Sequence, residues 1–266
     1  MKLLKLFIFL SFIVTQSLFS FTIDTFNPKA SLTENFSTNC LQMTQSQQIL
    51  KTYVMVGLNS SFQNPKETLK KAVVDYDKRA HQMHDYFHNL LGDKNVKARA
   101  SFDEALKLWE SSKTMLETVP NEKNALKLRE NLQTMITKLL EGTKPLATPD
   151  LELISLTGKL CRKPIEITID YLMRIWGIHI EGYDKDIKKI IKNYHTNLDT
   201  LLTNKLNNKE SKALLSKSRK QFMFFEFMYN AKSRFIPNLL SKKADDNFLI
   251  IRSIKKIYKK QAEKDI

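Results

Sequence analysis

Three basic residues in the middle of the chain are the first candidates for chemistry. Lys159, Arg162 and Lys163 fall within about one helical turn of each other, close to where we expect a helix to begin. Cationic side chains bind small anions, and the free backbone N–H groups of a first helical turn add to that binding. The simpler interpretation is that these are solvated basic residues at a helix end. The residues alone leave both interpretations open.

Three histidines form the second candidate group. His81, His84 and His88 are spaced at i, i+3 and i+7, which places them on one side of an expected helix. Imidazoles at this spacing can share a transition metal. At the repeat offset introduced below, however, His84 and His88 correspond to Leu202 and Leu206, so we expect them to line or edge the interior of a bundle. We therefore predict no metal and no cofactor.

Motifs of the common catalytic classes are missing from the sequence. It contains no G-x-G-x-x-G or P-loop for phosphates, and no H-E-x-x-H or paired C-x-x-C for a metal. Acid, base and nucleophile residues nowhere come together in it. We therefore expect that the protein is not an enzyme.

The N-terminus has the pattern of an export signal. Lys2 and Lys5 make the start basic, Leu6–Val14 is almost wholly apolar, and Ser20 is small. This order is typical of a signal peptide, here residues 1–20. The apolar run is shorter than the roughly 20 residues that a membrane span needs. We expect a periplasmic protein; secretion, or anchoring by an uncleaved signal, is the alternative.

Charge is distributed unevenly along the chain. The formal net charge is +15; residues 151–266 carry 24 Lys and Arg against 13 Asp and Glu, whereas residues 21–150 carry 17 against 15. A basic second half favours an anionic partner such as a small anion, lipid headgroups or an acidic protein. Nucleic acid is not expected as a partner of an exported protein. A solvated, lysine-rich surface is the alternative explanation.

The elements that must position these residues are helices. Only six Gly and seven Pro occur, and apolar residues recur at steps of three and four, so we predict an all-α fold. The stretch 154–182 is expected to be one long helix that opens at the basic cluster of residues 158–163. A related stretch, residues 40–57, lies 118 positions upstream, which is the separation of Tyr53 and Tyr171.

The offset of 118 extends into the next helix. Six apolar positions recur: Leu69, Ala72, Val73, Tyr76, Ala80 and Met83 correspond to Ile187, Ile190, Ile191, Tyr194, Leu198 and Leu201. Further along, Asn124 matches Asn247 at an offset of 123. Such a pattern indicates an internal duplication. We predict two tandem antiparallel four-helix bundles, residues 21–143 and 151–266 with a linker at 144–150, that can pack as a pseudo-dimer.

A run of phenylalanines marks a candidate interface. Phe222, Phe224, Phe225 and Phe227 make the third helix of the second copy apolar on nearly every side. A helix of this kind is covered on more than one side. Its own bundle supplies one cover, and we expect the first copy or a second protein to supply another. A lipid-facing or ligand-enclosing role is the alternative.

Residues at the start of each copy follow a common pattern. It comprises Ile154, Gly158, Asp170, Tyr171 and Leu172 in the second copy, and Gln47, Lys51 and Tyr53 in the first. The pattern resembles a consensus close to I-N-x-A-G-R-Q-R-M-L-S-Q-R-x-A-K-x-Y. That consensus belongs to helix one of the N-terminal sensor module shared by type IV pilus chemotaxis transducers (PilJ) and NarX-like nitrate/nitrite sensor kinases. The resemblance covers both copies.

The resemblance implies an extracytoplasmic four-helix bundle that works as a dimer, with the first helices meeting across the symmetry axis. In nitrate-sensing members, motif arginines from both partners hold the anion, because the planar guanidinium matches oxyanions. Here Lys159 stands at the first arginine position, and Cys161 stands at the second with Arg162 one step further on. In the first copy Leu41 and Met43 stand at these positions.

The two cysteines lie one in each motif segment. Cys40 and Cys161 are three places out of register between the copies. If the copies pack as an internal pseudo-dimer, the segments come together, and an oxidising compartment allows a disulfide between them. A closed loop of roughly 120 residues would stabilise the fold by a few kcal/mol. Two buried, unpaired thiols are the alternative.

Together these features predict an exported, sensor-like helical module that binds a small anion or a membrane-bound transducer of pilus or chemosensory machinery. The chain shows no kinase or methyl-accepting segment, so we expect a partner to carry the signal across the membrane. The alternative is a structural or adaptor protein of a periplasmic or pilus-associated assembly with no small ligand. The sequence makes no prediction of the oligomeric state.

Overall fold

The computed structural model describes residues 26–230 and 236–263. This part of the chain is all-α and contains no strand, which confirms the predicted fold class. The predicted signal peptide, residues 1–20, lies outside the described residues. The α-helices are α1 (Leu32–Gly57), α2 (Pro65–Leu91), α3 (Val96–Leu116), α4 (Glu122–Thr143), α5 (Pro149–Ile175), α6 (Tyr183–Leu202), α7 (Lys209–Asn230) and α8 (Pro237–Ala262). None of the described helices has an apolar stretch of the length and low charge needed to cross a membrane.

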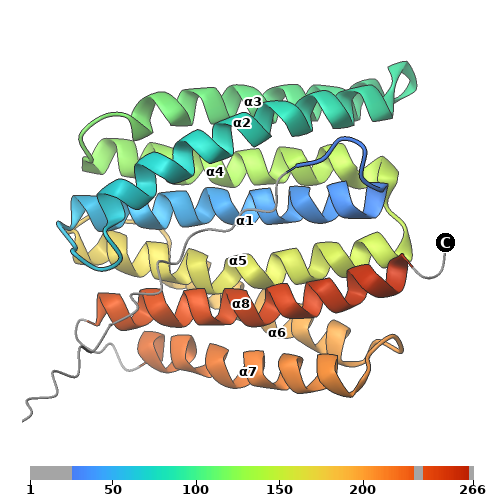
Figure 1. Cartoon of the computed structure of the whole chain (residues 1–266). Helices are drawn as coiled ribbons and strands as arrows, with labels where there is room; N and C mark the ends of the chain where they lie inside the picture. The colour runs from blue at the N-terminus through green and yellow to red at the C-terminus, as the bar shows by residue number, and fades with distance from the viewer. Residues whose placement is uncertain (1–25, 231–235, 264–266) are drawn as a thin grey trace, which may run out of the picture.

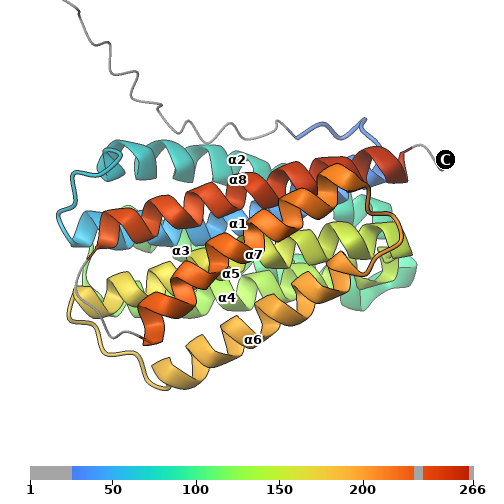
Figure 2. The same cartoon turned by 90° about the horizontal axis from the view of Figure 1, so that it is seen from below.

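Helices that follow each other in the chain run antiparallel (Figure 1). Among the first four, α1 and α3 each contact α2 and α4. Among the last four, α5 and α7 each contact α6 and α8. These groups are termed the first half (α1–α4) and the second half (α5–α8). The halves meet where α1 and α5 lie parallel and in contact, with α8 also touching α1, while α6 and α7 lie on the outer side (Figures 1 and 2).

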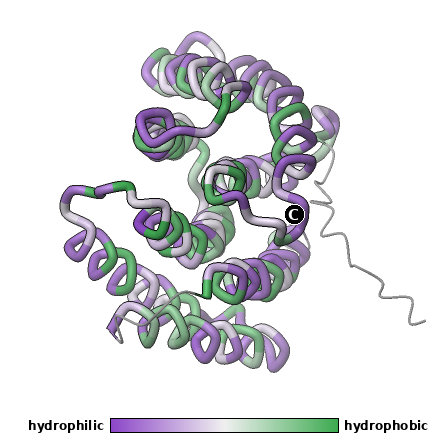
Figure 3. The backbone as a smooth tube through the Cα atoms, turned by 90° about the vertical axis from the view of Figure 1, so that its left-hand side faces the viewer, coloured by the Kyte–Doolittle hydropathy of each residue, from purple (hydrophilic) through white to green (hydrophobic). Residues whose placement is uncertain are grey.

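Apolar faces turn toward the spaces between the helices, as the end-on view shows (Figure 3). α1 departs from this one-sided pattern because α2, α4, α5 and α8 all contact it. As a result 22 of its 26 residues are buried, polar ones included. α1 is therefore the central helix of the molecule, although many of its buried side chains are polar.

Helix boundaries repeat at the predicted offset through the first two helices of each half. α1 and α5 end at residues 57 and 175, and α2 and α6 begin at 65 and 183, so both pairs differ by 118. α3 and α7 begin at 96 and 209, a difference of only 113, mainly because α6 has 20 residues and α2 has 27. The offset of 123 is therefore wrong: Asn124 lies in the first turn of α4, whereas Asn247 is buried in the middle of α8.

The second central helix begins earlier than the sequence pattern indicates. α5 starts at Pro149, since the Thr148 side chain accepts the Leu151 N–H and the proline occupies the first turn. It ends at Ile175 and not at residue 182. The expected opening at residues 158–163 is therefore wrong. These residues lie about three turns inside the helix, where backbone N–H groups bond to the preceding turn.

Candidate functional site

The parallel helices α1 and α5 approach closely at two points, and a glycine makes room each time. A Cβ atom on Gly158 of α5 would lie 3.1 Å from Cys40 Cβ of α1. Further along, a Cβ atom on Gly57 of α1 would lie 2.1 Å from the ring of Trp176, the residue directly after α5. Positions 40 and 158 differ by 118, the repeat offset. Corresponding positions of α1 and α5 therefore face each other at this contact.

Arg162 lies beside this contact with its charge buried. The residue is only 3 % exposed, and its Nη1 donates to Met43 Sδ of α1 at 4.0 Å. Nη1 also lies 3.7 Å from where a Cβ on Gly158 would stand. Across residues 26–230 and 236–263, no carboxylate forms an ion pair with the guanidinium. A thioether is a weak acceptor, so this charge is poorly compensated by its neighbours.

Two further cations lie near Arg162. Lys159, one turn earlier in α5, is partly buried; burial lowers the pKa of its ammonium group, and the Arg162 charge lowers it further. Lys255 of α8 is buried and donates to the Ser37 carbonyl of α1 at 2.9 Å. All three charges act on the Cys40 thiol, since burial raises its pKa and these charges partly lower it. Positive charge is therefore concentrated where α1, α5 and α8 meet.

Lys163, the third predicted ligand, has a partner of its own. Its Nζ lies 2.6 Å from a carboxylate oxygen of Glu166, one turn further along α5. Both side chains are largely buried, so the pair is internally satisfied. Of the three predicted anion ligands, the structure groups Lys159 and Arg162 and directs Lys163 elsewhere.

Cys40 and Cys161 are buried free thiols, so the structure does not contain the predicted disulfide. The reason is register: Cys40 faces Gly158, and Cys161 lies three residues further on, about 4.5 Å along the helix axis. Burial raises the pKa of the Cys40 thiol and raises that of Cys161 to about 12. Both thiols are thus protonated at neutral pH and pack as small apolar groups.

Buried ion pairs that the sequence analysis missed connect the two halves. Lys51 of α1 lies 2.6 Å from Asp245 of α8, with side chains 3 % and 8 % exposed. Arg129 of α4 donates twice to Asp170 of α5, at 2.7 and 3.0 Å, and once to Asp186 of α6 at 3.2 Å. Lys51 and Asp170 both belong to the pattern repeated in the sequence. One partner of each ion pair was therefore already singled out by the sequence. The partners are distant in the chain and no local signal marks them.

α1 also buries amide side chains in two different ways. Gln42 and Gln45 accept hydrogen bonds from the buried Arg79 of α2, each at 3.0 Å. Asn39 is 1 % exposed, and neither its Nδ2 nor its Oδ1 has a partner; Gln47 Nε2 is likewise unbonded. A buried polar group without a partner costs about 1–3 kcal/mol. Stability alone does not explain the polar character of α1.

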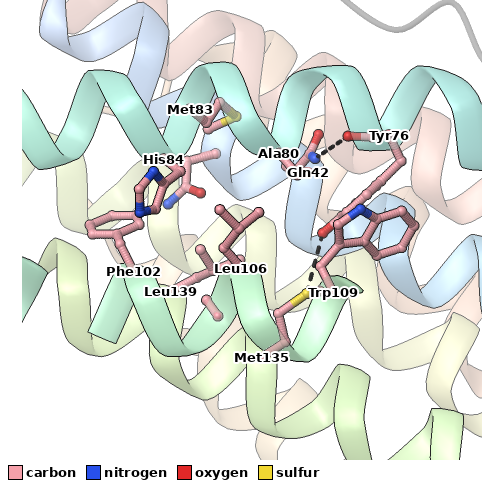
Figure 4. Close-up of a pocket in the computed structure, with 12 residues that line it drawn as sticks. Gln42, Tyr76, Ala80, Met83, His84, Phe102, Leu106, Trp109, Met135 and Leu139 are labelled. Carbon is pink, nitrogen blue, oxygen red and sulfur yellow. Dashed lines mark hydrogen bonds between the residues drawn. The ribbon is translucent and has the colours of Figure 1, made fainter. Parts of the chain in front are cut away.

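A small cavity lies inside the first half, between α1, α2, α3 and α4 (Figure 4). Its volume of about 30 Å³ is room for roughly two water molecules and too little for an organic ligand. Tyr76, His84, Trp109 and Met135 lie on its wall. Asn39 also lines it, and its unbonded amide suits a bound water.

The three histidines of α2 are divided between two groups. His81 Nε2 lies 3.1 Å from Glu110. His84 and His88 instead face Asp103 of α3. Both are half-buried, and His84 borders the cavity, as expected for positions at the edge of the interior. The structure therefore does not bring the sequence-derived trio together but supplies a carboxylate to two of its members.

The phenylalanines of α7 divide between the core and the surface. Phe222 and Phe225 are fully buried within the second half, and Phe224 is partly buried. Phe227 is 64 % exposed and Met223 is 58 % exposed. α7 packs on α5, α6 and α8 and turns its remaining face outward, so the first half does not supply the expected second cover and a second protein stays a prediction.

Comparison with known proteins gave no match to any family model, curated protein or solved structure. Function must therefore be inferred from the geometry of this chain.

Proposed function

We propose that the protein is an exported, sensor-like helical module that binds a small oxyanion between α1 and α5, with Arg162 and Lys159 as cationic ligands. In this proposal, residues 21–143 and 151–266 are tandem four-helix bundles of the PilJ/NarX-like type, packed as an internal pseudo-dimer. Residues 1–20 direct it to the periplasm, where a membrane-bound transducer carries the signal onward.

The observation that carries this proposal is the burial of Arg162 without a carboxylate partner. Removing an unpaired ionised group from water costs several kcal/mol. A crowded lysine such as Lys159 can relieve repulsion by losing its proton, but arginine stays charged at any physiological pH. A bound oxyanion would supply the missing negative charge and accept hydrogen bonds from the planar guanidinium.

The contact between Cys40 and Gly158 supports the pseudo-dimer. In a two-fold dimer, equivalent residues of the two subunits meet at the axis. Here the positions that meet differ by the repeat offset of 118. Both cationic ligands belong to α5 of the second half. The α1 residue that Arg162 contacts is the uncharged Met43. One anion held mainly by the second half is the arrangement that this asymmetry favours.

Thermal-shift measurements on the exported chain with nitrate, nitrite and other small oxyanions test the proposal. A ligand that binds the native state alone raises the melting temperature by mass action. At least one oxyanion should stabilise the protein beyond chloride at equal ionic strength. That stabilisation should disappear in Arg162→Ala, weaken in Lys159→Ala and persist in the matched control Lys163→Ala. Absence of any oxyanion effect, or an unchanged effect in Arg162→Ala, would contradict the proposal.

A second candidate function is that of a structural or adaptor protein with no small ligand. The exposure of Met223 and Phe227 on α7 favours it, because neighbouring apolar side chains in water are typical of a protein contact. In that case no oxyanion shifts the melting temperature. A partner recovered with the wild-type chain from a periplasmic extract would also be lost with Phe227→Ser.

A further inference from the structure

Two histidines and an aspartate at the contact between α2 and α3 have the separations of metal ligands. His84 Nε2 lies 2.8 Å from Asp103 Oδ1, and His88 Nε2 lies 3.6 Å from the same oxygen. One ligand atom from each residue falls within 4.8 Å of the other two. In a tetrahedral zinc site with bonds of about 2.0–2.2 Å, ligand atoms are roughly 3.3 Å apart. The observed geometry needs only small side-chain shifts to match.

Rigid elements position all three side chains. His84 and His88 are four residues apart on α2, which puts them on one helix face, with ring centroids 5.3 Å apart. Asp103 projects from the neighbouring α3. The histidine side chains are 19 % and 25 % exposed, and that of Asp103 is 44 % exposed. The site is thus half-enclosed and open to solvent on the aspartate side, which provides an entry path.

A second carboxylate orients the first histidine. His84 Nδ1 lies 3.1 Å from Asp85 Oδ1, so a proton on Nδ1 leaves Nε2 free to bind a metal. The Asp103 carboxylate, with Oδ1 2.8 Å from His84 Nε2, supplies the third ligand atom of the set.

An arginine competes for the same position. Arg99 Nε donates to His88 Nε2 at 3.2 Å, and its Nη1 lies 2.5 Å from Asp93. His88 Nε2 is the atom that a metal would use, so Arg99 and a metal exclude each other there. Because Asp93 is fully exposed, Arg99 can keep that partner while turning toward solvent.

We propose that His84, His88 and Asp103 bind a divalent transition metal of the zinc class, which displaces the Arg99 guanidinium and fastens α2 to α3. Two imidazoles and one carboxylate are a donor set that zinc favours, with water as a fourth ligand. The offsets of 118 and 113 pair His84 and Asp103 with Leu202 and Ser216 in the second half, whereas α6 ends before the position that corresponds to His88. Helix packing at these two places therefore requires neither a histidine nor an aspartate.

Zinc titration of the mature chain, first freed of metal by a chelator, tests this proposal. We expect one zinc per chain in competition with a chromogenic chelator, a raised melting temperature, and visible absorption when cobalt(II) replaces zinc. His84→Asn should weaken zinc binding by roughly 10- to 100-fold, and Asp103→Asn should weaken it similarly. Arg99→Gln should strengthen it several-fold. His81→Asn and His195→Gln are matched controls that should bind as the wild type does.

Equal zinc affinity in the wild type and in both His84→Asn and Asp103→Asn would overturn the proposal. So would a loss confined to His81→Asn, because that would assign the metal to Asp77, His81 and Glu110 instead. Melting curves recorded in chelator show whether each variant folds. Asp103 is the more exposed ligand, so its variant decides the question if His84→Asn is unstable.

Discussion

The two halves place an aromatic pair at corresponding positions. The Tyr76 ring packs on Trp109 with centroids 4.1 Å apart, and the Tyr194 ring stacks on Phe222 with centroids 3.5 Å apart. The tyrosines differ in number by 118 and their partners by 113, the offsets of the helices that carry them. The packing pattern is therefore repeated even where the residue types are not.

The hydroxyl groups of these two tyrosines form different hydrogen bonds. Tyr194, Ser218 and Asn247 form a closed ring of hydrogen bonds, at 2.5, 2.7 and 3.3 Å. The Tyr76 hydroxyl donates to Met135 Sδ at 3.7 Å, and Ala105 stands at the position of Ser218. In the second half these polar groups bond to one another, whereas in the first half Tyr76 lines the cavity. The first half is therefore less completely packed at this level, and it also contains the buried polar side chains of α1.

A polar pair beside the aromatic rings is repeated with the acidic residue on the other helix of the pair. Asp77 accepts from Lys113 at 2.8 Å in the first half, and His195 pairs with Glu226 at 2.7 Å in the second. The same offsets of 118 and 113 relate these residues. The comparison teaches that geometry persists here while chemistry diverges, so differences between the halves indicate specialised sites.

The largest expected effect concerns the buried ion pair between Lys51 of the first half and Asp245 of the second half. Lys51→Met should lower the free energy of unfolding by about 3–5 kcal/mol, because it leaves Asp245 buried and unpaired. Urea denaturation measures the loss. Lys127→Met, which removes an exposed pair with Glu130, should cost less than about 1 kcal/mol. Similar small losses in both variants would show that α1 is not held by this charge.

The close contacts of α1 and α5 should differ in tolerance. Gly57→Ala should destabilise the fold by about 1–3 kcal/mol, because the new Cβ would overlap the Trp176 ring. Gly158→Ala should cost less, since its Cβ would meet Cys40 at 3.1 Å and alanine favours a helix. Chemical denaturation of the two variants side by side gives the order. A larger loss in Gly158→Ala than in Gly57→Ala would contradict this order and show that the tighter contact lies at Gly158.

The aromatic pairs allow a direct comparison of the halves. Tyr194→Phe should cost about 1–2 kcal/mol, because Ser218 and Asn247 lose a buried partner. Tyr76→Phe removes only a weak O–H···S bond and should cost about 0.5 kcal/mol or less. Thermal or urea unfolding is sufficient to measure both. Equal losses would mean that the first half is as well satisfied as the second.

The smallest expected effect depends on pH. Burial raises the pKa of the Asp77 carboxyl, but hydrogen bonds from Lys113 and Trp109 outweigh it and lower the folded-state pKa. Such a group contributes stability above its unfolded pKa of about 4, and loses it as pH falls through the folded pKa. Asp77→Asn should therefore destabilise by up to about 1 kcal/mol at pH 6 and by less at pH 3. An equal loss at both pH values would exclude this linkage.

The sequence predicted what depends on local pattern. The all-α class and the offset of 118 follow from periodicity and turn residues. The start of α5 was missed because Gly158 was interpreted as a helix opening. It is a contact residue, placed where α1 comes too close for a side chain.

Contacts between residues far apart in the chain could not be predicted from local sequence patterns. The disulfide failed on a register difference of one turn, and the exposure of Phe227 depends on which helices cover α7. Asp103 joins His84 only through the packing of α3 on α2, and no spacing in the chain marks that contact. Arg162 and Lys159 were proposed as ligands from their residue types, but the burial of Arg162 could be seen only in the structure.

The stability of Arg162→Met in a buffer free of oxyanions tests the central claim most directly. If Arg162 is a ligand-binding cation kept buried without a counter-charge, an apolar side chain of similar length should leave the free energy of unfolding unchanged or raise it. The variant should also lose any oxyanion-induced stabilisation. A loss of several kcal/mol in that buffer would contradict the account, because it would show that the guanidinium is already compensated within the fold.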